Sequence, residues 1–329
     1  MIAADTLRVP GPSDPARSSY KEWLHLILVE HDEDLIGLLN VSIHGPPEGG
    51  TTQVVAAALF DAAGQEWIGN VVPGAWNEAS ITLSGISTAS VSVAFGPDDR
   101  LLAAVTMDRI SLDVVATAAT GAHMIDDPGQ FGSGWIGWRL VPRLGVAGSI
   151  ELDGRRLNVS RVAAYHDHNW GRWHWGENIG WEWGSFLGRS GSSVVAGRTT
   201  NRIHDAYGQF TVIVDHDGAR CSFTTARVTA DWSGIAASPS RRLPGALAAL
   251  HADVRTPRLP SVLHLTAKNG HDAVDLVFES RAVAQLILAD PIDVGSSFLH
   301  EMSGRFTATG RIAGRSFEFD GLGMVERLE

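Results

Sequence analysis

Ionisable and aromatic side chains gather in one segment of the chain, AAYHDHNWGRWHWGENIGWEWGSF, which runs from Ala163 to Phe186. The segment contains five of the eleven tryptophans and three of the thirteen histidines, together with one aspartate and two glutamates. A protein core uses aromatic side chains for packing, but packing does not require them beside a His-Asp-His sequence. This segment is therefore the candidate functional site.

The spacing within the segment places different side chains on the two faces of a strand, because successive side chains of a strand point to opposite sides. If residues 165–170 are extended, one face carries Tyr165, Asp167 and Asn169, and the other carries His166, His168 and Trp170. The sequence GWEWG repeats this pattern, with Trp181 and Trp183 on one face and Glu182 on the other. Two such strands side by side would line one cavity with indole rings and a few ionisable groups.

Acid catalysis is the chemistry that this combination favours. A carboxyl group surrounded by indole rings loses solvation, so its pKa rises and it can hold a proton at neutral pH. A protonated Asp167, oriented by Tyr165 or by a histidine, could donate its proton to an alkene or a carbonyl. The faces of the tryptophan rings would shelter the resulting cation, each by roughly 0.5–2 kcal/mol. The substrate of such a site would be large and hydrophobic.

Metal binding and nucleophilic catalysis are weaker interpretations of the same residues. His166 and His168 share a face, and a third metal ligand could come from His174, Glu177 or Glu182, but an HxH pair alone is a weak metal signal. A serine nucleophile lacks support, because Ser185 stands in WGSF and no G-x-S-x-G motif occurs.

A purely structural interpretation also remains open. Asp167, His168 and Asn169 would then form a hydrogen-bonded network where two β domains meet, since buried polar groups require partners. Each histidine, taken singly, is expected to have a structural role.

Composition excludes several classes of partner. The formal net charge of the 329 residues is -11, and no run is rich in Lys and Arg. Nucleic acid and anionic membrane surfaces are therefore not expected partners, because both need clustered positive charge. The chain has one cysteine, Cys221, and no apolar stretch near the ~20 residues that span a bilayer. Without a recognisable signal peptide, we expect a soluble cytoplasmic protein.

Short runs rich in β-branched residues, split by Gly, Pro, Asp or Asn, occur along most of the chain and predict an all-β fold of antiparallel sheets. The sequences DGRRLNVSRVAAYH and AGRSFEFDGLGMVE align without gaps, which favours two related β domains in tandem. We expect a flexible leader over residues 1–18, an N-terminal domain over 19–187 and a C-terminal domain over 188–329. A short helix is expected over 243–254, where alanines follow Pro244.

The motif YHDHNWG, followed by GWEWGSF, resembles the hydroxyneurosporene synthase (carotenoid 1,2-hydratase) family of lipocalin-like proteins. Weaker similarity extends over WIGWRLVPRLGVAGSIELDGRRLNVS, DWSGIAASPSRRLPGAL and GLGMVERL. The resemblance implies two packed lipocalin-like β-barrel or sandwich domains. It also implies addition of water to a carbon–carbon double bond of an isoprenoid chain without a redox cofactor. Other members are similar to cyclases of secondary metabolism, including proteins that accelerate Diels–Alder reactions.

The resemblance carries the family's motif aspartate onto Asp167 and its motif tyrosine onto Tyr165, and His168, Asn169 and Trp170 match the rest of the motif. This chain departs from the pattern at His166 and at Glu182. A histidine of the family that lies upstream of the motif has no counterpart, and Trp135 and Trp138 occupy that neighbourhood.

The leading hypothesis is a cofactor-independent hydratase or cyclase acting on an alkene or polyene of a hydrophobic isoprenoid or polyketide-like molecule. Asp167 would donate the proton, Tyr165 would orient it, and His168 would position water or the acid. The substrate-binding residues would be Trp138, Trp170, Trp175, Trp181, Trp183, Asn169 and Glu182. We expect neither a cofactor nor a metal. A pericyclase and a non-catalytic carrier of lipophilic molecules are the alternatives.

Overall fold

The computed structural model describes residues 5–11, 14, 17–45, 53–64, 66–75, 78–235, 241–243, 259–289 and 295–329. Within these ranges the chain forms strands and three short 3-10 turns, Arg17–Ser19, Val159–Arg161 and Thr225–Arg227, and no α-helix. The all-β prediction is therefore confirmed. The helix expected over 243–254 lies, apart from residue 243, outside the described residues.

The first sheet has thirteen strands in the order β4-β3-β2-β1-β13-β11-β9-β8-β7-β6-β5, with β10 and β12 paired to β11. Its strands are β1 (Tyr20–Glu30), β2 (Leu35–His44), β3 (Gln53–Ala62), β4 (Glu66–Ala75), β5 (Ser80–Thr82), β6 (Gly85–Ser87), β7 (Val91–Gly96), β8 (Arg100–Met107), β9 (Ile110–Ala118), β10 (His123–Phe131), β11 (Gly134–Leu152), β12 (Arg155–Arg156) and β13 (Val162–Arg172).

The second sheet has ten strands in the order β17-β16-β15-β14-β23-β22-β21-β20-β18, with β19 paired to β21. Its strands are β14 (Gly180–Gly188), β15 (Ser193–Thr200), β16 (Tyr207–His216), β17 (Ala219–Thr224), β18 (Val228–Ser233), β19 (Arg241–Leu243), β20 (Val262–Asn269), β21 (Asp272–Ala289), β22 (Ser296–Ile312) and β23 (Arg315–Leu328). The pairs are antiparallel except for the parallel pair β19–β21. The chain passes from the first sheet to the second between Arg172 and Gly180. The domain division after residue 187 stays a prediction.

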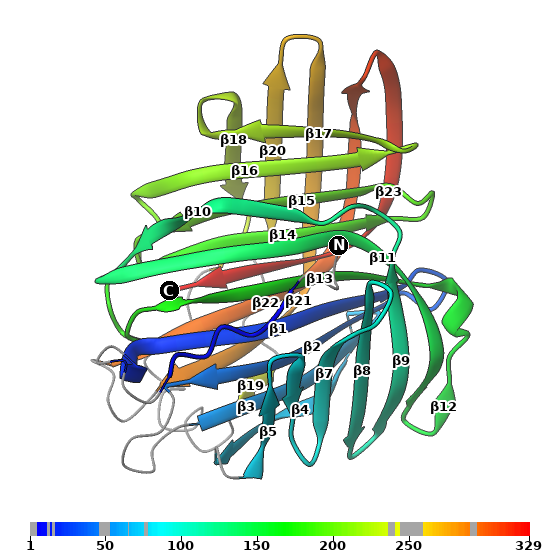
Figure 1. Ribbon diagram of the computed structural model, residues 1–329. Helices are drawn as coiled ribbons and strands as arrows, with labels where there is room; N and C mark the ends of the chain where they lie inside the picture. The colour runs from blue at the N-terminus through cyan, green and yellow to red at the C-terminus, as the bar shows by residue number, and fades with distance from the viewer. Residues whose placement is uncertain are drawn as a thin grey trace.

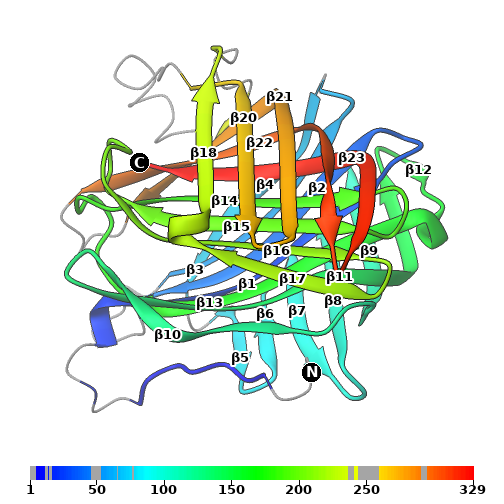
Figure 2. The same ribbon diagram turned by 90° about the horizontal axis from the view of Figure 1, so that it is seen from above.

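The apolar side chains form three main clusters, one inside each curled sheet and one between the sheets. Figure 1 shows β1, β13 and β11 of the first sheet beside β14, β22 and β23 of the second, and the central cluster takes side chains from both groups. Seen from above, β20 and β21 cross β15 and β16, so the second sheet folds over its own cluster (Figure 2). Among the described residues, no helix is long and apolar enough to cross a membrane.

The central strands are buried on both faces because each lies between its own sheet's core and the other sheet. β14 is buried at every position, and β13 at every position except Arg172. By contrast, β9 alternates between buried and more exposed residues, as expected for a sheet with one face in water. Polar side chains on β13 and β14 therefore lie in the interior whichever face they occupy.

Packing between the sheets can be tested at Gly197 of β15, which lies opposite Trp183 of β14. A Cβ atom at Gly197 would lie 1.8 Å from Cε3 of Trp183, whose ring is stacked on Trp138. We expect Gly197→Ala to displace this ring, to lower the free energy of unfolding in urea by about 1–3 kcal/mol and to change the tryptophan emission. The matched control is Gly145→Ala on β11, where a Cβ meets nothing within 4 Å. Equal stability of the two variants would contradict this packing.

Candidate active site between the two sheets

Ionisable side chains from both sheets meet in the central layer. On the first sheet, His25 of β1 is the cross-strand partner of Asp167 of β13. On the second, Glu326 of β23 pairs with Glu301 of β22 on one side and with Trp183 of β14 on the other. Cross-strand partners share a face of their sheet, so His25 and Asp167 lie on one face of the first sheet, and Glu301, Glu326 and Trp183 lie on one face of the second. These two faces approach each other at His25 and Glu326, where Nε2 lies 3.6 Å from Oε1.

Asp167 is held by a chain of hydrogen bonds. The Tyr165 hydroxyl donates to Oδ2 of Asp167 over 2.7 Å, and the Asn169 amide donates to Oδ1. The Trp183 indole N–H donates to the Tyr165 hydroxyl, also over 2.7 Å. The Trp183 ring in turn stacks on Trp138, with ring centroids 5.7 Å apart and an interplanar angle of 10°. These contacts fix the orientation of the Asp167 carboxyl group.

Three carboxyl groups of the central layer have raised pKa values. Burial raises the pKa of Asp167 to about 7, although hydrogen bonds from Tyr165 and Asn169 favour the ionised form. Burial, with repulsion from Asp167, raises the pKa of Glu326 to about 8. The pKa of Glu301 lies well above its usual range, first because of burial and then because of the charges of Glu326 and Asp167. The carboxyl cluster of Asp167, Glu301 and Glu326 therefore retains protons at neutral pH.

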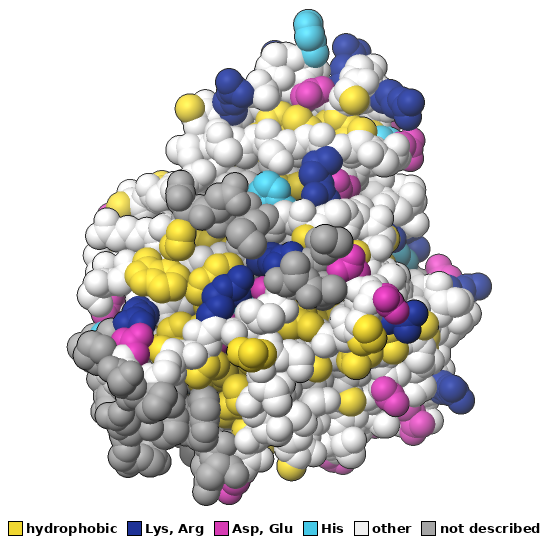
Figure 3. Space-filling model, viewed as in Figure 1, with side chains coloured by type: hydrophobic (Ala, Val, Ile, Leu, Met, Phe, Trp, Pro, Cys, Tyr) yellow, Lys and Arg dark blue, Asp and Glu magenta, His cyan; other side chains and the backbone are white. Residues whose placement is uncertain are grey.

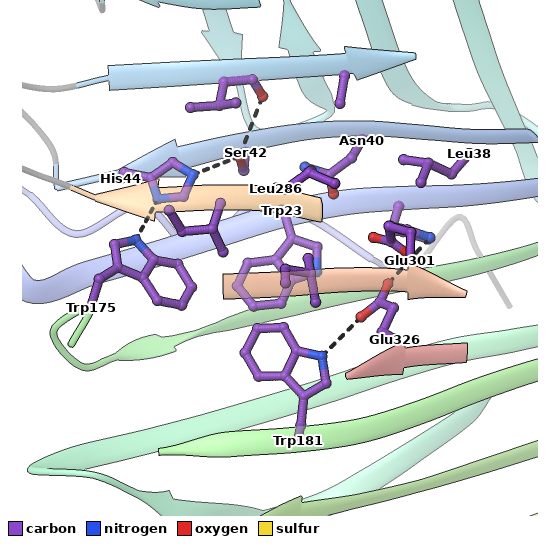
Figure 4. A pocket seen from close by; sticks show the side chains of 15 residues that line it. Trp23, Leu38, Asn40, Ser42, His44, Trp175, Trp181, Leu286, Glu301 and Glu326 are labelled. Carbon is purple, nitrogen blue, oxygen red and sulfur yellow. Dashed lines mark hydrogen bonds and ion pairs between the residues drawn. The ribbon is translucent and has the colours of Figure 1, made fainter. Parts of the chain in front are cut away.

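A cavity of about 50 Å³ lies beside the carboxyl cluster. Its polar lining consists of His25, Asn40, Ser42, His44, Glu301 and Glu326, and its apolar lining of Trp23, Leu38, Val55, Ala57, Trp175, Trp181, Leu286, Leu288 and Leu299 (Figure 4). The volume is room for roughly three or four water molecules, so a larger ligand requires side chains of the wall to move. On the face of the molecule that Figure 1 shows, hydrophobic side chains gather at the surface (Figure 3).

The two histidines of the cavity wall are neutral. Burial, together with the charge of Lys21, lowers the pKa of His44 to about 3, and burial, together with His166, lowers that of His25 to about 3. The Trp175 indole donates to Nδ1 of His44 over 3.2 Å, so Nε2 carries the proton and donates to the Ser42 hydroxyl over 2.7 Å. The described lining contains no Lys or Arg.

His166, His168 and Trp170 lie on the opposite face of β13, as the alternation predicted. His168 is held between Asp5 (Nδ1 to Oδ2, 3.0 Å) and Glu22 (Nε2 to Oε1, 2.7 Å). Burial lowers the pKa of His168, but the hydrogen bonds to both carboxylates outweigh burial and raise it, which favours an imidazolium. Nδ1 of His166 lies 2.8 Å from the carbonyl oxygen of His25, and Trp170 packs under the Arg8 guanidinium, 3.6 Å from the ring centroid.

The N-terminal segment contributes to this second network, because Asp5 and Leu7, both within the expected leader, are buried against the first sheet. The structure thus separates His168 and Trp170 from the cavity. Within the described residues no group of three or more His, Cys, Asp or Glu side chains is arranged to hold a metal ion.

Glu182 also points away from the cavity, on the face of β14 opposite Trp181 and Trp183. Its carboxylate accepts from Arg198 (2.9 Å) and Arg327 (2.7 Å) and lies 3.0 Å from Nδ1 of His204. Burial raises the pKa of Glu182, but the hydrogen bond to His204 and the charges of Arg198 and Arg327 outweigh it and lower the pKa to about 2. Glu182 is therefore ionised within a network of ion pairs.

Of the residues predicted for the site, the structure brings together Tyr165, Asp167, Asn169, Trp138 and Trp183 around the acid, and Trp175 and Trp181 at the cavity. Sequence reasoning missed His25, Glu301 and Glu326. The available signal was an acid inside an apolar run, as in SSFLHEM and GLGMVERL. That β1, β22 and β23 bring these side chains near Asp167 of β13 in the central layer could not be deduced from it.

The raised pKa of Glu326 predicts a pH dependence of stability. Between the ordinary pKa of 4.5, at which the unfolded state releases the proton of Glu326, and the raised value of about 8, the folded state still holds this proton. The free energy of unfolding should therefore fall as the pH rises through this window. His25, Asp167, Glu301 and Trp181 face Glu326. Glu326→Gln is expected to be more stable than the wild type at pH 8, by on the order of 3 kcal/mol, but not at pH 4.

Urea unfolding at a series of pH values measures this effect. Glu318→Gln, at an exposed carboxyl of the same strand β23, serves as the control and should leave the pH dependence unchanged. Parallel curves for Glu326→Gln and the wild type from pH 4 to pH 8 would contradict a protonated Glu326.

No protein-family model matches the chain, and no curated protein matches it in sequence. Solved structures share its fold over nearly the whole length. A protein of Nitrosomonas europaea provisionally named AttH superposes with a TM-score of 0.69 at 15% identity, covering 98% of each chain. Kievitone hydratase from Nectria haematococca superposes with a TM-score of 0.62 at 14% identity, covering 98% of this chain and 93% of its own.

CghA, solved with Sch210972, superposes with a TM-score of 0.62 at 11% identity, covering 95% of this chain and 89% of its own. At these identities the comparisons show that the chain shares the two-sheet fold of these three proteins.

Proposed function

We propose that the chain is a cofactor-independent enzyme that hydrates or cyclises an alkene or polyene of a hydrophobic small molecule. One observation carries the proposal: a carboxyl cluster that retains protons at neutral pH lies beside a cavity lined with tryptophan. Such an acid can protonate a weakly basic carbon or oxygen. The hydratase activity named for a protein of the same fold, and the motif YHDHNWG, support this assignment.

Asp167 is the proposed proton donor; it does not itself line the cavity, so the substrate reaches it when side chains of the wall move to admit the ligand. Tyr165 and Asn169 fix its orientation, and burial raises its pKa to about 7, so that it retains a proton near neutral pH. In hydration, the Asp167 O–H bond breaks and its proton forms a C–H bond with one alkene carbon. Water then bonds to the resulting cation and returns a proton to the Asp167 carboxylate. The net reaction converts an alkene and water into an alcohol and regenerates the acid.

The indole rings of the central layer would stabilise the intermediate. Trp181 lines the cavity, and Trp183 contacts Tyr165. The face of an indole ring attracts a nearby cation by about 0.5–2 kcal/mol. Whether water or a second double bond captures the cation decides between hydration and ring closure.

A pericyclase is the second candidate, favoured by the closely packed apolar wall of the cavity. Trp23, Trp175 and Trp181 converge on it, with ring centroids of Trp23 and Trp181 5.9 Å apart. Such a wall could hold a linear polyene in a reactive fold, and catalysis would then come mainly from orientation.

The first experiment is native mass spectrometry of the protein incubated with a panel of polyenes and isoprenoids, followed by product analysis. A product heavier by one water supports hydration, and an isomer of unchanged mass supports ring closure. If every ligand is recovered unaltered, the enzymatic proposal fails and the carrier alternative takes its place.

We expect Asp167→Asn to lower kcat by about 10²–10⁴-fold for a reaction that needs the proton, while ligand binding survives, because the amide keeps the shape but cannot supply the proton. Steady-state kinetics and a binding titration on the same preparation measure the two effects. The control, Asp275→Asn, alters an exposed carboxyl and should leave both unchanged. A reduction of less than about tenfold would refute acid catalysis by Asp167 and favour the pericyclase.

A further inference from the structure

Glu301 and Glu326 form a pair of acids on the cavity wall itself. They are cross-strand partners on β22 and β23, Glu301 is buried and the Glu326 side chain is 12% exposed, and both line the cavity, as Figure 4 shows. Asp167, in contrast, does not line it. The sequence motif has no member in this pair, and the proposed mechanism assigns it no step.

The pair has hydrogen-bonding capacity that the described residues do not use. Oε2 of Glu301 is buried and has no hydrogen-bond partner there. Glu326 accepts from the Trp181 indole at Oε2 (3.0 Å), but its Oε1 lies 3.6 Å from Nε2 of His25, too far for a hydrogen bond. A buried polar atom without a partner costs about 1–3 kcal/mol, so a ligand that supplies the partner gains affinity.

The protonation state of the pair follows from its surroundings. Two adjacent carboxyls in the interior, with a third at Asp167, cannot all be ionised, and the described cavity lining contains no Lys or Arg to neutralise them. Each protonated carboxyl offers one O–H donor. The pair therefore suits a neutral oxygen acceptor.

The rest of the lining determines which other groups the ligand can carry. Apart from the acid pair and the polar side chains of β1 and β2, the cavity is lined by Trp23, Trp175 and Trp181, by leucines of β2, β21 and β22, and by Val55 and Ala57 of β3. These side chains offer a hydrophobic ligand contact area but few hydrogen bonds.

We propose that Glu301 and Glu326 bind the carbonyl-type oxygen at one end of an otherwise hydrophobic ligand, by donating hydrogen bonds from their carboxyl groups. Calling this ligand the substrate rests on the proposed function. The binding itself does not, so a binding assay can support or refute it whatever the outcome of the turnover experiments.

The test uses two probes of nearly identical shape, 2-acetylnaphthalene and 2-ethylnaphthalene, which differ by a carbonyl in place of a methylene group. Quenching of tryptophan emission and equilibrium dialysis give the two dissociation constants on the full-length protein. We expect the ketone to bind about tenfold more tightly, as one hydrogen bond to an otherwise unpaired buried group provides. The infrared carbonyl band of the bound ketone should also shift to lower wavenumber.

Two double variants test whether Glu301 and Glu326 cause the preference for the ketone. Glu301→Gln/Glu326→Gln keeps an N–H donor at each position and should retain the preference for the ketone. Glu301→Met/Glu326→Met keeps similar volume without a donor and should abolish both the preference and the infrared shift. Binding of 2-ethylnaphthalene within about threefold of the wild type in each variant serves as the control that the cavity is intact.

Three results would overturn the proposal: no preference for the ketone in the wild type, a preference that survives in the methionine variant, or a preference lost equally in the glutamine and methionine variants. Failure of Asp167→Asn to affect turnover would refute the acid mechanism and leave this binding result untouched.

Discussion

The burial of the central strands on both faces is the constraint on which the rest of the site depends. β13 and β14 each lie between the core of their own sheet and the opposite sheet, so water reaches neither face. Every polar side chain on these strands must find a hydrogen-bond partner, an opposite charge or a proton. The three solutions occur within a few residues of one another. Asn169 donates to Asp167, Glu182 pairs with two arginines, and Asp167 has a raised pKa.

The two faces of β13 use these solutions to opposite electrostatic effect. On the first-sheet side, His168 lies between two carboxylates, and its raised pKa favours a charged network. On the cavity side, the carboxyls have raised pKa values and His25 has a lowered one, which favours an interior of neutral donors and acceptors. A hydrophobic ligand is compatible with the second environment and not with the first. This difference is the physical reason for locating the chemistry on the side of Asp167.

The sequence allowed the fold class and one half of the site to be predicted. Period-two alternation assigned Tyr165 and Asp167 to one face and His168 to the other, and indole rings beside Asp167 implied its raised pKa; the structure agrees on both points. The cavity could not be predicted from the sequence in the same way, because alternation within one strand does not show which strands of the other sheet lie opposite. Glu182 illustrates this: its residue type suggested a ligand contact, but only the register of β14 against β15 and β23 reveals its arginine partners. Glu301 and Glu326 depend on the packing of one sheet on the other, which no local pattern encodes.

The position of β13 between two cores has a consequence for how the protein can evolve. A substitution on one face of β13 contacts a different set of neighbours from a substitution on the other face. A shift of β13 by one residue against its neighbouring strands would move every side chain from the neutral environment to the charged one, or the reverse. New ligand preferences are therefore more accessible through apolar cavity-lining side chains such as Leu38 and Leu286, which make no hydrogen bond or ion pair that a substitution would break. The fold thus joins a strand that carries the acid and its hydrogen-bond partners to flanking strands whose cavity-lining leucines can change without leaving a polar group unpaired.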